Sequence, residues 1–230
     1  LFLHQNEYVM IEKQILIVLN ALKAIPMGEK LSLDLLDNLV YKKIMTDRVE
    51  PYTEEMAKDR YYALRAMYSS LFNNYSKGLV SKAALARLIK TLVVSVMFKG
   101  NGSKKSKDAY INRNSSLPPS LAVISPTQKC NLNCTGCYAS SDSKRCNSID
   151  HFTIEKVVNQ LYNRMGMRFF VISGGEPLLY NSEGYTIFDL AKNFKDCFFL
   201  VYTNGTLINK SVAKKIAECG NITPAISVEG

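Results

Sequence analysis

The feature that most constrains the fold of this chain is an alternation of short apolar runs with helical patterns between residues 121 and 230. The apolar runs cover residues 121–124, 169–172, 198–202 and 225–228, and they have the length and character of buried strands. Each stretch between two runs contains a segment of helical periodicity. Strands joined through helices pair in parallel with right-handed connections. The sequence therefore predicts an α/β unit with a parallel sheet, which is either open and doubly wound or the beginning of a barrel.

A group of three cysteines follows the first of these runs. Cys130, Cys134 and Cys137 have the spacing C-x3-C-x2-C. Three thiolates can bind one metal centre, but they cannot complete the four-sulfur shell of a structural zinc site or of an electron-transfer cluster. A 4Fe-4S cluster held by three cysteines leaves one iron open to a substrate. The spacing favours such a cluster, and the alternative is a zinc site completed by a distant ligand such as Cys146 or His151.

Each of the other runs ends in a short motif. These motifs are Gly174-Gly175-Glu176-Pro177, Thr203-Asn204-Gly205 and Ser227-Val228-Glu229-Gly230. In parallel α/β folds the carboxyl ends of the strands meet at the edge where ligands bind, so we expect all four motifs at one site. The double glycine would let a ligand approach the backbone closely and leave backbone polar groups free for it. The alternative is a tight turn that places Glu176 near a helix N-terminus.

Taken together, the cysteine loop and the three later motifs resemble the radical SAM (radical S-adenosylmethionine) superfamily over roughly residues 117–230. The resemblance implies that residues 121–230 hold the first four β/α units of a partial (β/α)6 TIM-like barrel. It also implies that Cys130, Cys134 and Cys137 each bind one iron of a 4Fe-4S cluster, whose open iron binds S-adenosylmethionine.

The resemblance further implies which residues contact this cofactor. The turn at residues 174–177 would hold the amino group of S-adenosylmethionine, with Glu176 supporting either that contact or the turn. Thr203 and Asn204 would lie beside the cofactor or the substrate.

Two expectations concern the ends of the site. Ser227 and Glu229 match the strand-end position that often contacts the ribose or methionine portion of the cofactor in this family. The family commonly has an aromatic residue before the third cysteine, where this chain has Gly136; the backbone there, or the ring of Tyr138, would meet the adenine. The residues expected to bind the cofactor are Gly136, Tyr138, Gly174, Gly175, Glu176, Pro177, Thr203, Asn204, Ser227 and Glu229.

The function implied is that of an enzyme that reductively cleaves S-adenosylmethionine to a 5′-deoxyadenosyl radical, which abstracts hydrogen from a substrate. Modification of a peptide or protein and biosynthesis of a cofactor are both compatible with it, and an electron donor such as flavodoxin or ferredoxin is expected. The alternative from another class is a 4Fe-4S redox or sensor protein that does not cleave S-adenosylmethionine.

Residues 1–120 have a different pattern. Helical periodicity predicts helices near residues 7–24, 32–45, 53–77 and 81–98, which would form an all-α N-terminal domain over residues 1–99. Residues 100–120 have the composition of a linker, and we expect the domain boundary there, with residues 121–230 as the radical SAM core. The helical domain could also act as a module that recruits a peptide or protein partner.

Charge and cysteine usage bear on partners and location. The net charge is +9, but no Arg-rich run accompanies it, so an ordinary solvated surface is expected rather than a nucleic-acid interface. Cysteines outside the loop are scattered, unlike a disulfide scaffold, which favours a reducing cytoplasm. No apolar run approaches the ~20 residues that span a bilayer. Because the sequence begins with Leu1 rather than Met and stops at a glycine that ends a predicted strand, we expect an internal fragment of a longer chain.

Overall fold

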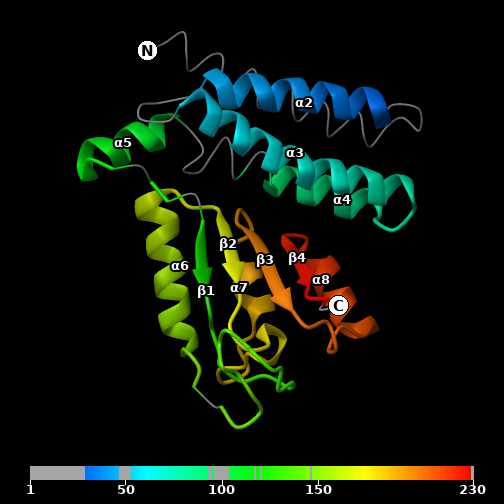
Figure 1. Cartoon of the computed structure of the whole chain (residues 1–230), viewed down its shortest axis with the longest axis vertical. Coiled ribbons are helices and arrows are strands. Elements are labelled where there is room, and N and C mark those ends of the chain that lie inside the picture. Colours follow the sequence, from blue (N-terminus) through cyan, green and yellow to red (C-terminus); the bar gives the residue numbers. More distant parts are fainter. Residues whose placement is uncertain are drawn as a thin grey trace. The chain divides into compact units, whose positions relative to one another are not determined.

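The computed structural model of this chain describes residues 29–46, 53–92, 95, 104–116, 118–119, 121–145 and 147–228. The chain divides into two compact units, Leu1–Pro118 and Pro119–Gly230. In the described residues the first unit is helical, whereas the second alternates strands with helices (Figure 1). None of the helices in the described part of the chain is long and apolar enough to cross a membrane. The helix expected near residues 7–24 lies outside the described residues.

The described helices of the first unit are α2 (Glu29–Thr46), α3 (Glu54–Ser76), α4 (Lys82–Ile89) and α5 (Lys104–Asn114). As the sequence predicts, Thr53 caps α3, because its hydroxyl accepts a hydrogen bond from the backbone N of Met56 at 3.2 Å. Within the stretch 100–120 that the sequence analysis expects to be a linker, the structure contains helix α5. In the helix expected over 81–98, α4 is followed by a wider π-helical turn at residues 90–92, and residues 93–94 and 96–98 lie outside the described residues.

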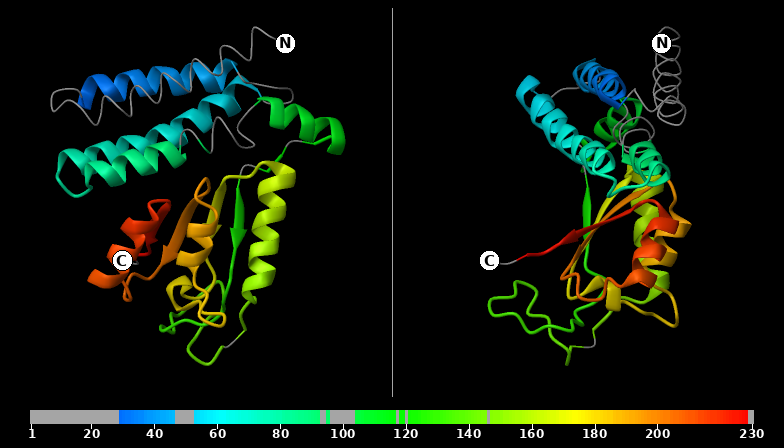
Figure 2. Two further views of the ribbon diagram at one scale, coloured as in Figure 1. Left: turned by 180° about the vertical axis from the view of Figure 1, so that it is seen from behind. Right: turned by 90° about the vertical axis from the view of Figure 1, so that its right-hand side faces the viewer.

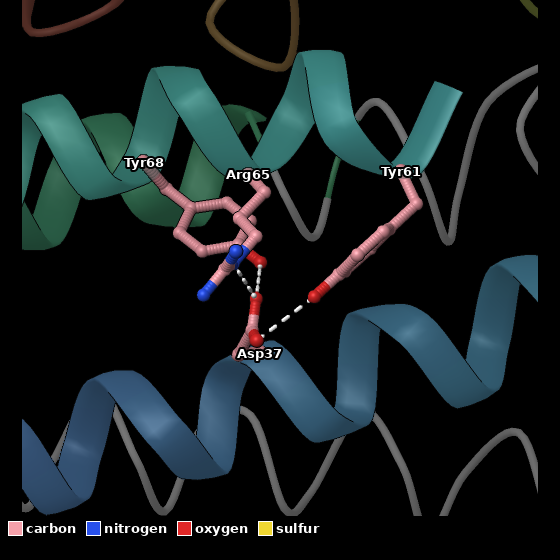
Figure 3. A network of polar contacts seen from close by, with 4 residues as sticks. All are labelled: Asp37, Tyr61, Arg65 and Tyr68. Carbon is pink, nitrogen blue, oxygen red and sulfur yellow. Dashed lines mark hydrogen bonds and ion pairs between the residues drawn. The ribbon is translucent and has the colours of Figure 1, made fainter. Parts of the chain in front are cut away.

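A polar cluster joins α2 to α3 (Figure 3). Asp37 on α2 accepts hydrogen bonds from the hydroxyl of Tyr61 at 2.8 Å, from Nε of Arg65 at 3.1 Å and from the hydroxyl of Tyr68. Both tyrosines are buried. Burial and the adjacent carboxylate raise the pKa of Tyr61 to about 12 and raise the pKa of Tyr68 as well. Because a buried hydroxyl without a partner is costly, this cluster fixes how the two helices align.

The second unit contains a parallel sheet, which confirms the fold expected from the alternating pattern. Its strands are β1 (Ala122–Ile124), β2 (Phe169–Ile172), β3 (Phe198–Thr203) and β4 (Ile222–Ile226), and they pair in the order β1-β2-β3-β4. The last strand begins three residues before the run at 225–228 from which it was predicted. It includes Pro224, which a strand tolerates here because β4 lies at the edge of the described sheet.

Three helices cover one face of this sheet, as Figure 2 shows in its right-hand view. They are α6 (His151–Met165), α7 (Ile187–Asn193) and α8 (Lys210–Cys219), and a short 3-10 helix, η2 (Pro177–Leu179), follows β2. The core between sheet and helices includes Phe170 and Phe199, packed with Ile154 and Val158 of α6. On the other face, Val123 is 61% exposed. The sheet is therefore covered by helices on one side.

The start of α6 differs from the sequence-based expectation. The sequence predicts Thr153 as the N-cap, because a helical pattern follows it, but the helix begins at His151 and Asp150 caps it. The Asp150 carboxylate accepts hydrogen bonds from the backbone N of Thr153 at 2.9 Å and from its hydroxyl at 2.7 Å. Gly166 ends the helix at φ +67°, as expected for a left-handed C-terminal position.

Candidate functional site

The expected motifs gather at one edge of the sheet because the four strands run in the same direction. The loop that follows β1 and carries the cysteines lies beyond the carboxyl ends of the strands (Figure 1). Backbone hydrogen bonds join the two ends of this loop at its base. The N–H of Gln128 donates to the carbonyl of Asn147 at 2.9 Å, and the N–H of Ile149 donates to the carbonyl of Pro126 at 2.8 Å. Cys134 and Cys137 lie beyond this base, in the tip of the loop, whereas the N–H of Cys130 donates to the carbonyl of Asp142 at 3.0 Å.

The double glycine packs directly against the start of the cysteine loop. The N–H of Gly175 donates to the carbonyl of Thr127 and the N–H of Glu176 to that of Lys129, both at 2.8 Å. A Cβ at Gly174 would lie 2.6 Å from the Thr127 carbonyl oxygen, and one at Gly175 would lie 2.2 Å from that of Lys129. The loop thus uses the N–H groups of Gly175 and Glu176, although backbone polar groups of the double glycine were expected to be free for a ligand. The glycines permit this close contact between two backbones.

Glu176 is fully buried, with 0% of its surface exposed. Its carboxylate accepts hydrogen bonds from the hydroxyl of Thr203 at 2.8 Å, from the N–H of Asn204 at 2.9 Å and from the N–H of Leu178 at 3.1 Å. A buried carboxylate needs such partners. Glu176 was expected to support either the cofactor contact or the turn. These hydrogen bonds show that it supports the turn, because they join the turn to the end of β3. Pro177 is buried and begins η2.

The side chain of Asn204 extends the same connection to the cysteine loop. Its Nδ2 donates to Oδ1 of Asn131 at 3.0 Å and lies 3.8 Å from Sγ of Cys130, within hydrogen-bond reach of sulfur. Thr203 is buried, and its hydroxyl already donates to the carboxylate of Glu176. Hydrogen bonds thus connect the cysteine loop, the G-G-E-P turn and the end of β3 in one continuous set.

The three cysteines of the loop are free thiols. Cys134 is exposed, whereas Cys130 and Cys137 are partly buried, and the N–H of Cys137 donates to the carbonyl of Cys134 at 3.3 Å. Within the described ranges no three His, Cys, Asp or Glu side chains converge as a metal-binding group. The structure therefore places the thiols on one loop without bringing them together, and their role as cluster ligands stays a prediction. As a donor set, three free thiols on one loop fit a cluster held by three cysteines.

Tyr138 and Gly136 lie on the exposed part of the same loop. The Tyr138 ring is 80% exposed, and its hydroxyl shares a hydrogen bond with Oγ of Ser173, the residue before the double glycine. Gly136 has φ +75° with open space around it, so its backbone conformation explains the glycine. Sequence reasoning missed Ser173, although its position between a buried strand and two glycines was an available signal.

The last motif is only partly described. Ser227 is exposed, and its N–H donates to the carbonyl of Thr203 at 2.9 Å, which continues the pairing of β4 with β3. Glu229 lies outside the described residues, as does Cys146. The contacts expected of Ser227 and Glu229 with a cofactor stay predictions.

Two thiols outside the loop have environments unlike those of the loop cysteines. Cys197 is fully buried, and this burial raises its pKa to about 12. Cys219 is partly buried, which also raises its pKa, and its Sγ donates to the carbonyl of Phe188 at 3.7 Å. A thiol must lose its proton to bind a metal, so neither residue suits a ligand role.

Comparison with known proteins points to the second unit. Residues 124–230 match the model of the Radical SAM superfamily. An uncharacterized protein of Methanocaldococcus jannaschii is 33% identical over 111 residues, which cover 47% of this chain and 38% of that protein. The cysteine-type anaerobic sulfatase-maturating enzyme of Clostridium perfringens is 32% identical over 114 residues, covering 44% of this chain and 31% of the enzyme. The chain thus spans about a third of the length of these relatives.

Among solved structures, SuiB of Streptococcus suis bound to S-adenosylmethionine is similar to part of this chain. The TM-score is 0.42 at 26% identity, over 55% of this chain and 27% of SuiB.

Proposed function

We propose that this chain, whose residues 124–230 match the model of the Radical SAM superfamily, is part of an enzyme that binds a 4Fe-4S cluster and S-adenosylmethionine at the carboxyl edge of its sheet. The observation that carries this proposal is the contact between the cysteine loop and the G-G-E-P turn, made by two backbone hydrogen bonds of 2.8 Å. When bound and reduced, the cluster would supply the one electron needed to cleave S-adenosylmethionine to methionine and a 5′-deoxyadenosyl radical, which would abstract hydrogen from the substrate.

The protein's part is to hold and orient these groups. Cys130, Cys134 and Cys137 would hold the cluster. The amino group of S-adenosylmethionine is a hydrogen-bond donor at the turn, so it would be received by carbonyl oxygens there. This fits a turn whose N–H groups at Gly175 and Glu176 are already used.

Further contacts of the cofactor would come from the neighbouring strand ends. The exposed ring of Tyr138 or the backbone at Gly136 would meet the adenine. Ser227 and Glu229 would contact the ribose or methionine portion. Asn204 would lie beside the cluster, and Thr203 would act through Glu176, to which its hydroxyl donates.

The parallel sheet would be the first part of a partial (β/α)6 barrel, preceded by an all-α domain. Helices cover one face of the sheet. Val123 and Tyr202 stand next to the core residues Ile124 and Val201 in their strands and so face the other side, where they are 61% and 47% exposed. In a barrel this second face would line the interior. Completing the barrel would exclude water and oxygen from the reacting groups.

For the substrate we propose a peptide or protein, with biosynthesis of a cofactor as the second possibility. The relative named a sulfatase-maturating enzyme supports the first choice. The electron donor would be a flavodoxin or a ferredoxin, and the expected compartment is the cytoplasm, where the free thiols of the loop would remain reduced.

Anaerobic reconstitution with iron and sulfide, followed by reduction with dithionite in the presence of S-adenosylmethionine, tests the proposal. Chromatography should then detect 5′-deoxyadenosine. The Cys134→Ala variant should lose both the product and the brown colour of the cluster, whereas Cys219→Ser, a matched change outside the loop, should keep both. A cluster without cleavage would favour the redox or sensor protein. Stoichiometric zinc without iron would refute both.

A further inference from the structure

The side-chain amide of Asn204 has a defined orientation. The backbone N–H of Thr206, which can only donate, lies 3.0 Å from Oδ1 of Asn204, and the hydroxyl of Thr206 donates to the same oxygen at 2.7 Å. The oxygen of the amide must therefore point to Thr206, and the nitrogen must point the other way. On that side lie Sγ of Cys130 at 3.8 Å and Oδ1 of Asn131 at 3.0 Å.

The two hydrogens of this nitrogen match the two acceptors. Asn131 in turn donates its own Nδ2 to the hydroxyl oxygen of Thr206 at 2.8 Å, which closes a ring of three side chains. Each donor and acceptor in the ring has one compatible role, so reversing either amide would set donor against donor. The N–H that faces Cys130 is thus fixed by contacts independent of the cysteine.

The backbone of Asn204 is fixed as firmly as its side chain. Its N–H donates to the buried carboxylate of Glu176 at 2.9 Å, and the preceding Thr203 donates its hydroxyl to the other carboxylate oxygen. Glu176 is itself held by the turn after β2. The amide is therefore presented to the loop by the ends of two neighbouring strands.

We propose that Asn204 is a positioning residue that donates a hydrogen bond to the sulfur of Cys130 and so raises the reduction potential of the cluster bound there. This inference rests on the proposed function, because it requires that Cys130 is a cluster ligand. A hydrogen bond to a ligand sulfur stabilises negative charge, and the reduced cluster carries one more negative charge than the oxidised one. The N–H of Asn204 therefore favours the reduced state.

A potentiometric titration of the reconstituted chain tests this role, with the visible absorbance and the electron paramagnetic resonance of the cluster as readouts. Asn204→Ala removes the donor, and Asn204→Asp replaces it with a charged oxygen of nearly the same shape. At the midpoint potential of the unaltered chain, the ratio of reduced to oxidised cluster should fall about threefold in Asn204→Ala. In Asn204→Asp it should fall about tenfold, which corresponds to about 59 mV for a one-electron couple.

Two controls separate this effect from general damage. Asn163→Ala and Asn163→Asp make the same chemical changes on the exposed surface of α6, and they should leave the potential unchanged. Asn131→Ala removes the bridge from the loop to Asn204 but leaves the Asn204 donor and the two bonds from Thr206 in place. It should lower thermal stability without moving the potential.

The outcomes distinguish this inference from the function on which it rests. An unchanged potential in both Asn204 variants, or equal shifts in Asn131→Ala and Asn204→Ala, would overturn the role of Asn204 while leaving cleavage of S-adenosylmethionine intact. A cluster that shows the predicted order of potentials but yields no 5′-deoxyadenosine would support Asn204 and refute the enzyme. If the unaltered chain binds no iron, both fall. If only the two Asn204 variants fail to bind iron while their circular dichroism is unchanged, positioning of Cys130 is supported.

Discussion

Replacing Gly175 by alanine should separate the cysteine loop from the G-G-E-P turn. The added Cβ would lie 2.2 Å from the carbonyl oxygen of Lys129 and 2.8 Å from the carbonyl carbon of Gln128. These are backbone atoms of a loop whose base is itself hydrogen-bonded, so no side chain can rotate away. To reach ordinary contact distance, turn and loop must separate by about 1 Å.

The energetic consequence follows from what that separation breaks. The bonds from Gly175 to Thr127 and from Glu176 to Lys129 are 2.8 Å long, and a shift of this size removes both, at about 1 kcal/mol each. Overpacking adds roughly 1 to 3 kcal/mol. The variant should therefore lose roughly 3 to 5 kcal/mol of local stability.

Hydrogen exchange read by mass spectrometry is the suitable assay, because the chain has two units and its unfolding need not be two-state. Peptides that cover residues 173–178 should lose most of their protection in Gly175→Ala, and iron uptake should fall with it. Gly184→Ala is the matched control: its φ is +88° with open space around it, so it should suffer backbone strain of only about 1 to 2 kcal/mol. Equal exchange in Gly175→Ala and the unaltered chain would show that the two backbones do not touch.

Further predictions concern the thiols and the helical unit. In the native protein exposed Cys134 should react quickly with iodoacetamide, whereas Cys197, buried and with its pKa raised to about 12, should react only after unfolding, as peptide mapping would show. Asp37→Ala leaves the buried hydroxyls of two tyrosines without their acceptor and should destabilise the helical unit by roughly 2 to 4 kcal/mol in urea unfolding, unlike the exposed Asp34→Ala. Because the folded state holds Tyr61 neutral, with its pKa raised to about 12, the stability it contributes should be complete below pH about 10 and lost as the pH rises through about 12. The ultraviolet absorbance of its phenolate, taken as the difference from Tyr61→Phe, should show this late titration.

Much of the fold was predictable because its signals are local. Thr53 precedes two glutamates and a helical pattern, and it caps α3 as the sequence indicates. The parallel sheet followed from the alternation of strand and helix. Local signals failed where two of them competed. Asp150 and Thr153 are both good caps, and only the contacts of the folded chain show that Asp150 starts the helix while Thr153 bonds back to it.

The sequence predicts which segments meet at the site, but it does not predict the hydrogen bonds between them. The cysteine spacing and the motifs indicated which loops would meet, since parallel strands end at one edge. The N–H of Gly175, however, donates to the carbonyl of Thr127, and the carboxylate of Glu176 accepts the N–H of Asn204 at the end of β3. Such contacts depend on the register between strands distant in sequence, and no pattern of residue types encodes a backbone carbonyl as a partner.

The pinned base of the cysteine loop has a consequence for how the loop can take up a metal. Before any metal binds, the carbonyls of Thr127 and Lys129 already accept hydrogen bonds from the turn after β2. The N–H of Cys130 already donates to the carbonyl of Asp142, on the far side of the loop, at 3.0 Å. Ordering one residue of backbone costs roughly 1 to 2 kcal/mol. For the proposed cluster, that entropic penalty would fall on the tip that carries Cys134 and Cys137, because the backbone of Cys130 is held beforehand. Iron would first bind the cysteine whose backbone is already held, and the loop tip with the other two cysteines would then close onto it.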